Sequence, residues 1–139
     1  MNCQDIVFET SRFNLSEVGE HFINPCCFGE DLAEWLRAKL CERGVSADQP
    51  GQEDWGWYTG TTVGGQRYFI GIGGNPTENG APKNHGEWRI FVEKRRSLWQ
   101  LISGKNKITP EDEIISLLLN ILAQEPDFEQ IQLDPAPAN

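Results

Sequence analysis

The sequence has no long hydrophobic run. None of its segments reaches the roughly 18 consecutive apolar residues that a membrane-spanning helix needs. Its first residues, Met1 to Asp5, also lack the basic and apolar regions of a secretion signal. Both absences argue against a membrane protein and against a classically exported protein. We therefore expect a cytoplasmic protein that has no membrane partner.

Cysteine is scarce, with four residues at positions 3, 26, 27 and 41. A disulfide between the neighbours Cys26 and Cys27 would be strained, and the other spacings form no recognisable framework. We expect free thiols in a reducing compartment. A chain of 139 residues can bury a core without disulfides or metal, and 38% apolar residues are typical of a globular chain. The sequence predicts a single domain over 1–133 and a disordered tail over 134–139.

Basic residues are few, and the last part of the chain has none. The net charge is −9 and divides unevenly: residues 1–54 carry 11 acids and 4 bases, residues 55–108 carry 3 acids and 8 bases, and residues 109–139 carry 7 acids. An acidic total repels polyphosphate and anionic membranes, which argues against nucleic acid as the main partner. The basic middle third retains enough charge to hold a small anion or an acidic peptide.

The spacing of apolar residues predicts two long amphipathic helices, over about 29–43 and from Thr109 to Pro126. Thr109 is expected to be the N-cap of the second helix, with Pro110 in its first position. Residues 45–54 and 74–87 are predicted to be loops, the second of them mobile, and residues 97–102 a short turn of helix. Two-residue alternation predicts strands over 5–13, 55–63, 66–73, 88–93 and 128–133.

A Gly-Gly dipeptide at 64–65 predicts a tight hairpin, because both turn positions need a positive φ. In that register, two residues pair when their numbers sum to 129. Tyr58 then lies opposite Gly71, and Phe69 lies opposite Gly60. Aromatic rings over cross-strand glycines are a known way to stabilise a sheet, so we expect these two pairs to form such contacts.

The same register sorts the side chains of the hairpin onto two faces of the sheet. We predict a two-layer α+β domain with a mainly antiparallel sheet, two long helices on one face and the element order β-α-β-β-β-α-β. The face that the helices cover is expected to carry Trp57, Ile70, Ile72, Trp88, Ile90 and Val92.

The opposite face of the sheet is the first candidate site. Aromatic and arginine side chains are enriched where protein partners bind. We therefore predict a platform for another protein or for a second copy of the chain, unless the chain itself covers this face. The predicted binding residues are Tyr58, Arg67, Phe69, Arg89 and Phe91.

A competing hypothesis is a cysteine hydrolase in which Cys27 or Cys26 is the nucleophile and His85 is the base. The cysteines precede a predicted helix, whose positive N-terminal end favours a thiolate. A cysteine before a helix and a histidine near a later strand resemble the order found in papain-like hydrolases, including bacterial cell-wall peptidases. The small residue and glycine that follow the cysteine in those enzymes are absent here, and Glu30 and Asp31 oppose a thiolate.

No metal or cofactor is expected. Zinc ligands usually occur in closely spaced pairs, and this sequence has no such pair. The glycines at 71–74 are followed by a loop rather than a helix, so they do not form a phosphate-binding loop. The candidate metal ligands with these unsuitable spacings are His21, Cys26, Cys27, Cys41 and His85.

Two segments, HFINPCCFGEDL (21–32) and GEWRIFVEK (86–94), resemble segments of a family of small uncharacterised bacterial proteins. The resemblance implies no activity, substrate or catalytic residue. The size and acidity of the chain are similar to those of bacterial immunity proteins, which implies a bacterial cytoplasm. The sequence thus predicts a small non-enzymatic binding module.

Overall fold

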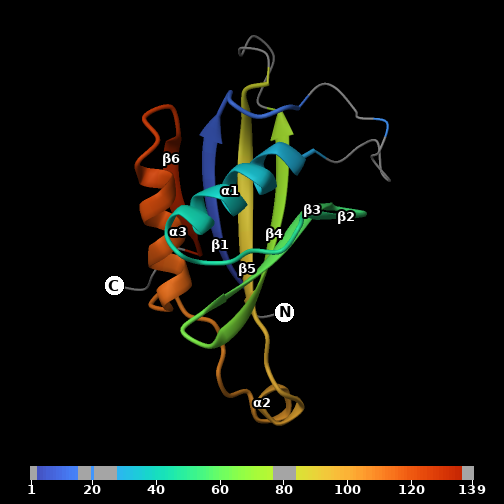
Figure 1. The fold of residues 1–139 in the computed structure, drawn as a ribbon, viewed down its shortest axis with the longest axis vertical. Coiled ribbons are helices and arrows are strands. Elements are labelled where there is room, and N and C mark those ends of the chain that lie inside the picture. The colour runs from blue at the N-terminus through green and yellow to red at the C-terminus, as the bar shows by residue number, and fades with distance from the viewer. Residues whose placement is uncertain (1–2, 16–19, 21–27, 77–83, 136–139) are drawn as a thin grey trace.

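A computed structural model describes residues 3–15, 20, 28–76 and 84–135 of the chain. These residues form a six-stranded sheet with the strand order β2-β3-β4-β5-β1-β6, together with three helices (Figure 1). Every neighbouring pair of strands is antiparallel, which confirms the predicted α+β class. The elements are β1 (Cys3–Thr10), α1 (Glu30–Glu42), β2 (Gly51–Glu53), β3 (Gly56–Val63), β4 (Gln66–Pro76), β5 (Gly86–Lys94), α2 (Leu98–Ser103), α3 (Glu113–Ala123) and β6 (Glu129–Asp134).

The hairpin of β3 and β4 has the predicted register, with Trp57 opposite Ile72 and Tyr58 opposite Gly71. Its turn residues at 64–65 have φ values of 56° and 80°. Glycine enters this left-handed region without a steric penalty, which is why the dipeptide closes a two-residue turn. Because side chains alternate along a strand, the register assigns each residue of the hairpin to one face.

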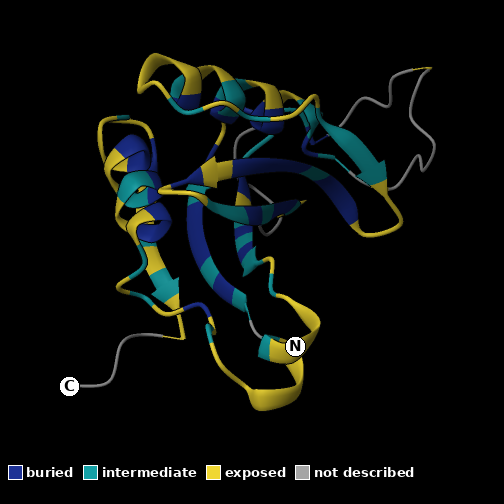
Figure 2. Cartoon of the chain, turned by 60° about the horizontal axis from the view of Figure 1, so that its bottom comes forward, coloured by how far each residue is buried: buried dark blue, intermediate teal, exposed yellow. Residues whose placement is uncertain are grey.

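The two longer helices pack against one face of the sheet and share a single hydrophobic core with it (Figure 2). α1 buries Leu32, Leu36 and Leu40, which recur once per turn on one side of the helix. α3 buries a similar apolar side that begins with Ile114 and Ile115. The sheet contributes the residues predicted for the covered face, and all of them are buried: Trp57, Ile70, Ile72, Trp88, Ile90 and Val92.

The second long helix begins later than predicted. Its N-cap is Asp112 rather than Thr109. Residues 109–112 instead close a separate turn, in which the Asp112 N–H donates to the Thr109 carbonyl at 3.1 Å. The Thr109 N–H donates in return to Asp112 Oδ2 at 2.7 Å. The carboxylate of Asp112 also pairs with Lys94 Nζ at 2.9 Å, so it is held outside the helix.

Two elements are absent from the predicted order, β2 and α2. β2 pairs with β3. α2 is the short turn of helix predicted over 97–102, and its N-cap Ser97 forms reciprocal hydrogen bonds with Gln100. The predicted 74–87 loop is shorter at both ends, because β4 and β5 remain paired through Pro76 and Gly86. Its remainder at 77–83 lies outside the described residues, as do 136–139 of the predicted tail. Among the described helices, none is long and apolar enough to cross a membrane.

Candidate binding face

The sheet face opposite α1 and α3, here called the open face, carries the five side chains that the sequence predicted there. Each of them is half-buried, so each is accessible to a partner without being detached from the sheet. Two adjoining grooves lie along this face. The five residues come from three neighbouring strands: Tyr58 from β3, Arg67 and Phe69 from β4, and Arg89 and Phe91 from β5.

Four aromatic rings on the open face, Trp55, Tyr58, Phe69 and Phe91, form the aromatic cluster. Tyr58 and Phe69 are stacked, with ring centroids 5.4 Å apart. The ring of Trp55 lies 4.9 Å from Phe91 and 6.2 Å from Phe69, measured between centroids. At these distances aromatic pairs interact directly. The cluster is therefore a continuous apolar surface whose rings hold one another in place.

Trp55 is the member of the cluster that sequence reasoning missed. Two-residue alternation continued back through the predicted strand 55–63 would put Trp55 on the same face as Trp57, and no face was predicted for it. In the structure Trp55 lies in the turn between β2 and β3, and 44% of its surface is exposed. The available signal was Gly56 directly after it, because glycine in a strand pattern often marks a bend or a close approach of two backbones.

Glycines allow two of these rings to lie close to the sheet. A Cβ added at Gly71 would lie 2.5 Å from Phe91 Cε1, and one added at Gly51 would lie 2.6 Å from Tyr58 Cζ. In both cases the ring and the glycine are paired residues of neighbouring strands. The prediction that Tyr58 covers Gly71 is therefore wrong, because Phe91 reaches that glycine from the other neighbouring strand.

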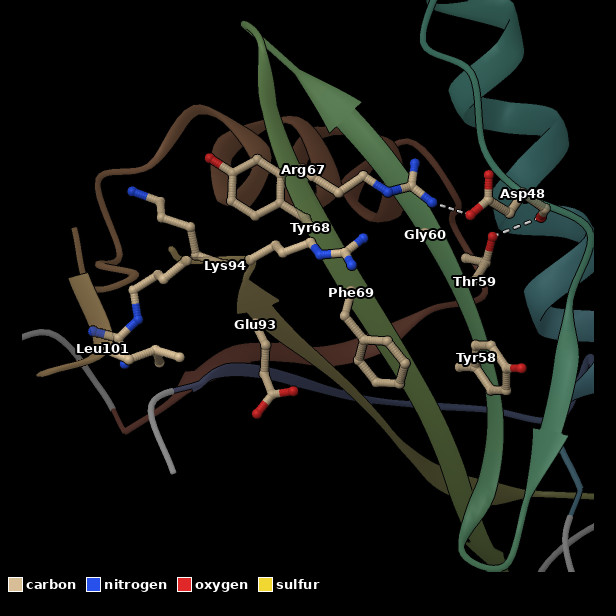
Figure 3. Close-up of a pocket in the computed structure, with 12 residues that line it drawn as sticks. Asp48, Tyr58, Thr59, Gly60, Arg67, Tyr68, Phe69, Glu93, Lys94 and Leu101 are labelled. Carbon is tan, nitrogen blue, oxygen red and sulfur yellow. Dashed lines mark hydrogen bonds and ion pairs between the residues drawn. The ribbon is translucent and has the colours of Figure 1, made fainter. Parts of the chain in front are cut away.

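The first groove has a volume of about 550 Å³ and is called the basic groove (Figure 3). Arg67 pairs with Asp48 in this groove. The pair lies over Gly60, the position that the sequence assigned to the ring of Phe69. The groove carries four basic residues against the acids Asp48 and Glu93. The basic residues that line it are Arg67, Lys94, Arg95 and Arg96.

The second groove has a volume of about 560 Å³ and is called the acidic groove, because among the described residues it is lined by three glutamates, Glu53, Glu87 and Glu93, and one basic residue, Arg89. The charge of Arg89 is already matched within the protein. Its Nη1 lies 2.5 Å from Asp5 and 2.8 Å from Asp134, which links β5, β1 and β6.

Hydrogen bonds from Arg89 to Asp5 and then to Asp134 raise the pKa of this guanidinium above its ordinary value. The geometry therefore makes Arg89 a residue that holds three strands together at the edge of the acidic groove.

The two grooves meet at Phe69 and Glu93, which line both of them. A segment lying across the open face would meet an excess of basic side chains at one end, aromatic rings in the middle and an excess of acidic side chains at the other end. Aromatic and arginine side chains often supply most of the binding energy of a protein interface. The charge difference between the grooves would select the direction in which the segment lies.

The residues of the hydrolase hypothesis are not brought together by the described part of the structure. Cys26 and Cys27 lie outside the described residues, and His85 is half-buried immediately before β5. Within the described residues, no three His, Cys, Asp or Glu side chains lie close enough to hold a metal ion. The hydrolase therefore stays a prediction from sequence.

Cys3 is expected to react more slowly than Cys41 with iodoacetamide near neutral pH. Cys41 is exposed, whereas Cys3 is half-buried and its Sγ lies 3.4 Å from Asp5 Oδ1. Burial and this hydrogen bond raise the pKa of the Cys3 thiol to about 11. Because the thiolate is the reactive form, labelling of Cys3 should accelerate as the pH rises toward that value. Peptide mapping by mass spectrometry checks this; equal labelling rates for the two thiols would contradict it.

Searches of protein-family models, curated proteins and solved structures find no match to this chain. The open face therefore supplies the observations that bear on function.

Proposed function

We propose that the chain is a non-enzymatic binding module that holds an extended segment of another protein on its open face. The observation that carries this proposal is the aromatic cluster, which lies half-exposed between two grooves of opposite charge excess. Contiguous apolar surface rimmed by polar residues often marks a site for a protein partner. The cytoplasmic location expected from the sequence is part of the proposal.

The predicted binding residues contribute in different ways. Tyr58, Phe69 and Phe91, joined by Trp55, would provide the apolar contacts. Arg67 pairs with Asp48 through one of its nitrogens and would provide polar contacts at the basic end through its remaining N–H groups. Arg89 would position the face rather than contact the partner with an unmatched charge, because Asp5 and Asp134 already pair with it.

A random peptide library displayed on phage tests the proposal. We expect the protein to select peptides with a large apolar residue flanked by acidic residues on one side and basic residues on the other. Tyr58→Ala and Phe69→Ala should each lower the affinity for the selected peptides at least about tenfold, as truncation of a residue at the centre of an interface does. Affinities are measured by titration calorimetry with synthetic peptides.

Thr62→Ala is the matched control for these variants. Thr62 is exposed on the same face of β3 as Tyr58 and belongs to neither groove. We expect this variant to bind the selected peptides as the parent protein does. Failure to select any peptide, or equal binding by all three variants, would contradict the proposal. If the partner is a second copy of the chain, the molecular mass of the protein in solution should rise with its concentration. The Phe69→Ala variant should then have a lower mass than the parent protein at the same concentration.

A further inference from the structure

The segment from Lys94 to Lys107 is here called the basic tip and contains α2. α2 lies at one end of the long axis of the molecule (Figure 1). α2 exposes its apolar side chains to solvent, whereas an ordinary surface helix packs them against the core. None of its residues is buried. The exposed fraction is 72% for Leu98, 79% for Trp99, 55% for Leu101 and 69% for Ile102.

The polar side of α2 is the side that is tied to the sheet. The Asn106 side chain donates to Gln100 Oε1 at 3.4 Å and to Gln66 Oε1 on β4 at 3.1 Å. Lys94 Nζ donates to Asn106 Oδ1 at 3.0 Å. These hydrogen bonds hold the helix in the orientation that exposes its apolar residues. The exposure is thus built into the structure of the tip.

The charge around this apolar helix is opposite to that of the whole chain. Residues 94–107 contain five basic residues and no acidic residue, within a protein of net charge −9. Asp112 neutralises Lys94. In the described part of the chain, Arg95, Lys105 and Lys107 form no ion pair. Charges beyond a Debye length of about 8 Å are largely screened at physiological salt, so an anionic surface at the tip responds mainly to these bases.

We propose that the basic tip binds the surface of an anionic lipid membrane, with α2 lying in the interface. Leu98, Trp99 and Ile102 enter the boundary between headgroups and acyl chains, where tryptophan is favoured. The neighbouring bases contact the anionic headgroups. The absence of a membrane-spanning segment does not bear on a helix that lies in the membrane surface, and the acidic total charge does not describe the tip.

Binding to lipid vesicles tests this proposal with the intact protein. Flotation should show binding to vesicles of phosphatidylcholine with phosphatidylglycerol, at least tenfold weaker binding to phosphatidylcholine alone, and loss of binding at high salt. Trp99→Ser with Ile102→Ser should weaken binding at least tenfold. Lys105→Gln with Lys107→Gln should weaken it roughly tenfold or more, because each base near an anionic surface contributes about fivefold.

Trp55→Ser is the matched control, because it removes a partly exposed tryptophan from the open face and leaves the basic tip unchanged. It should bind vesicles as the parent protein does. The proposal is overturned if anionic vesicles are not bound, or if the tip variants bind as well as Trp55→Ser. Self-association without lipid that the tip variants abolish would assign the tip to a second copy and also overturn it. Peptide selection uses no lipid, so failure of either proposal is distinguishable from failure of the other.

Discussion

Replacing Trp88 with alanine is expected to lower the free energy of unfolding by about 4 kcal/mol, because the change leaves a large cavity in the core. Trp88 has no exposed surface. Its ring meets Phe13 edge to face, with centroids 5.9 Å apart. It also lies over Gly74, where an added Cβ would be 2.6 Å from Trp88 Cζ3. Because residue 74 has no side chain, nothing at that position can move into the cavity that Trp88→Ala leaves.

Urea unfolding followed by circular dichroism measures this loss as a lower midpoint. A domain of this size is typically stable by about 5–15 kcal/mol, so the variant is expected to be marginal at 37 °C or unfolded. Trp99→Ala is the matched control, because Trp99 is 79% exposed and its removal should change the stability by less than about 0.5 kcal/mol. Similar losses for the two variants would mean that Trp88 does not fill the core as described.

Gly56→Ala is expected to destabilise the protein by about 3 kcal/mol, because the new methyl group would collide with backbone. A Cβ at Gly56 would lie against the carbonyl oxygen of Ile72 and 3.2 Å from its carbonyl carbon. Backbone atoms of a paired strand cannot move aside as a flexible side chain can. The hairpin must separate at this point, and Trp55, the preceding residue, should leave the aromatic cluster.

Gly73→Ala provides the control for this substitution. Gly73 lies in the facing strand, and a Cβ there would meet the carbonyl oxygen of Trp55 at an ordinary 3.6 Å. We expect a change of no more than about 0.5 kcal/mol in Gly73→Ala. Peptide binding should be weakened in Gly56→Ala even under conditions where it is folded. An equal effect of both substitutions on stability would contradict the close approach of β3 and β4 at Gly56.

The pairing of β3 with β4 could be predicted because it depends on neighbouring segments. A glycine pair between two alternating stretches determines the turn, and the turn determines the register. The faces of Tyr58 and Phe69 follow directly from that register. The same local information did not give the partners of the glycines, because Phe91 reaches Gly71 from a strand that is distant in sequence from the hairpin turn.

The start of α3 was less predictable, because a backbone N–H and a distant lysine both bind the side chain of its N-cap residue. Thr109 and Pro110 have the sequence of a helix start, but Asp112 binds both the Thr109 N–H and Lys94, which moves the N-cap to Asp112. Lys94 lies on β5, so this competition depends on tertiary structure. The sequence around residue 109 therefore does not reveal the ion pair between Asp112 and Lys94.

The sequence by itself determined the α+β class, the apolar stripe of α1, the hairpin register and the side chains of the open face, because each follows from periodicity within a short stretch. Only the tertiary structure decided that Trp55 turns onto the open face and that the apolar side of α2 faces solvent. The physical reason is that periodicity shows which residues share a side of an element. Which side meets the core depends on contacts with distant segments, such as those of Gly56 with Ile72 and of Asn106 with Gln66.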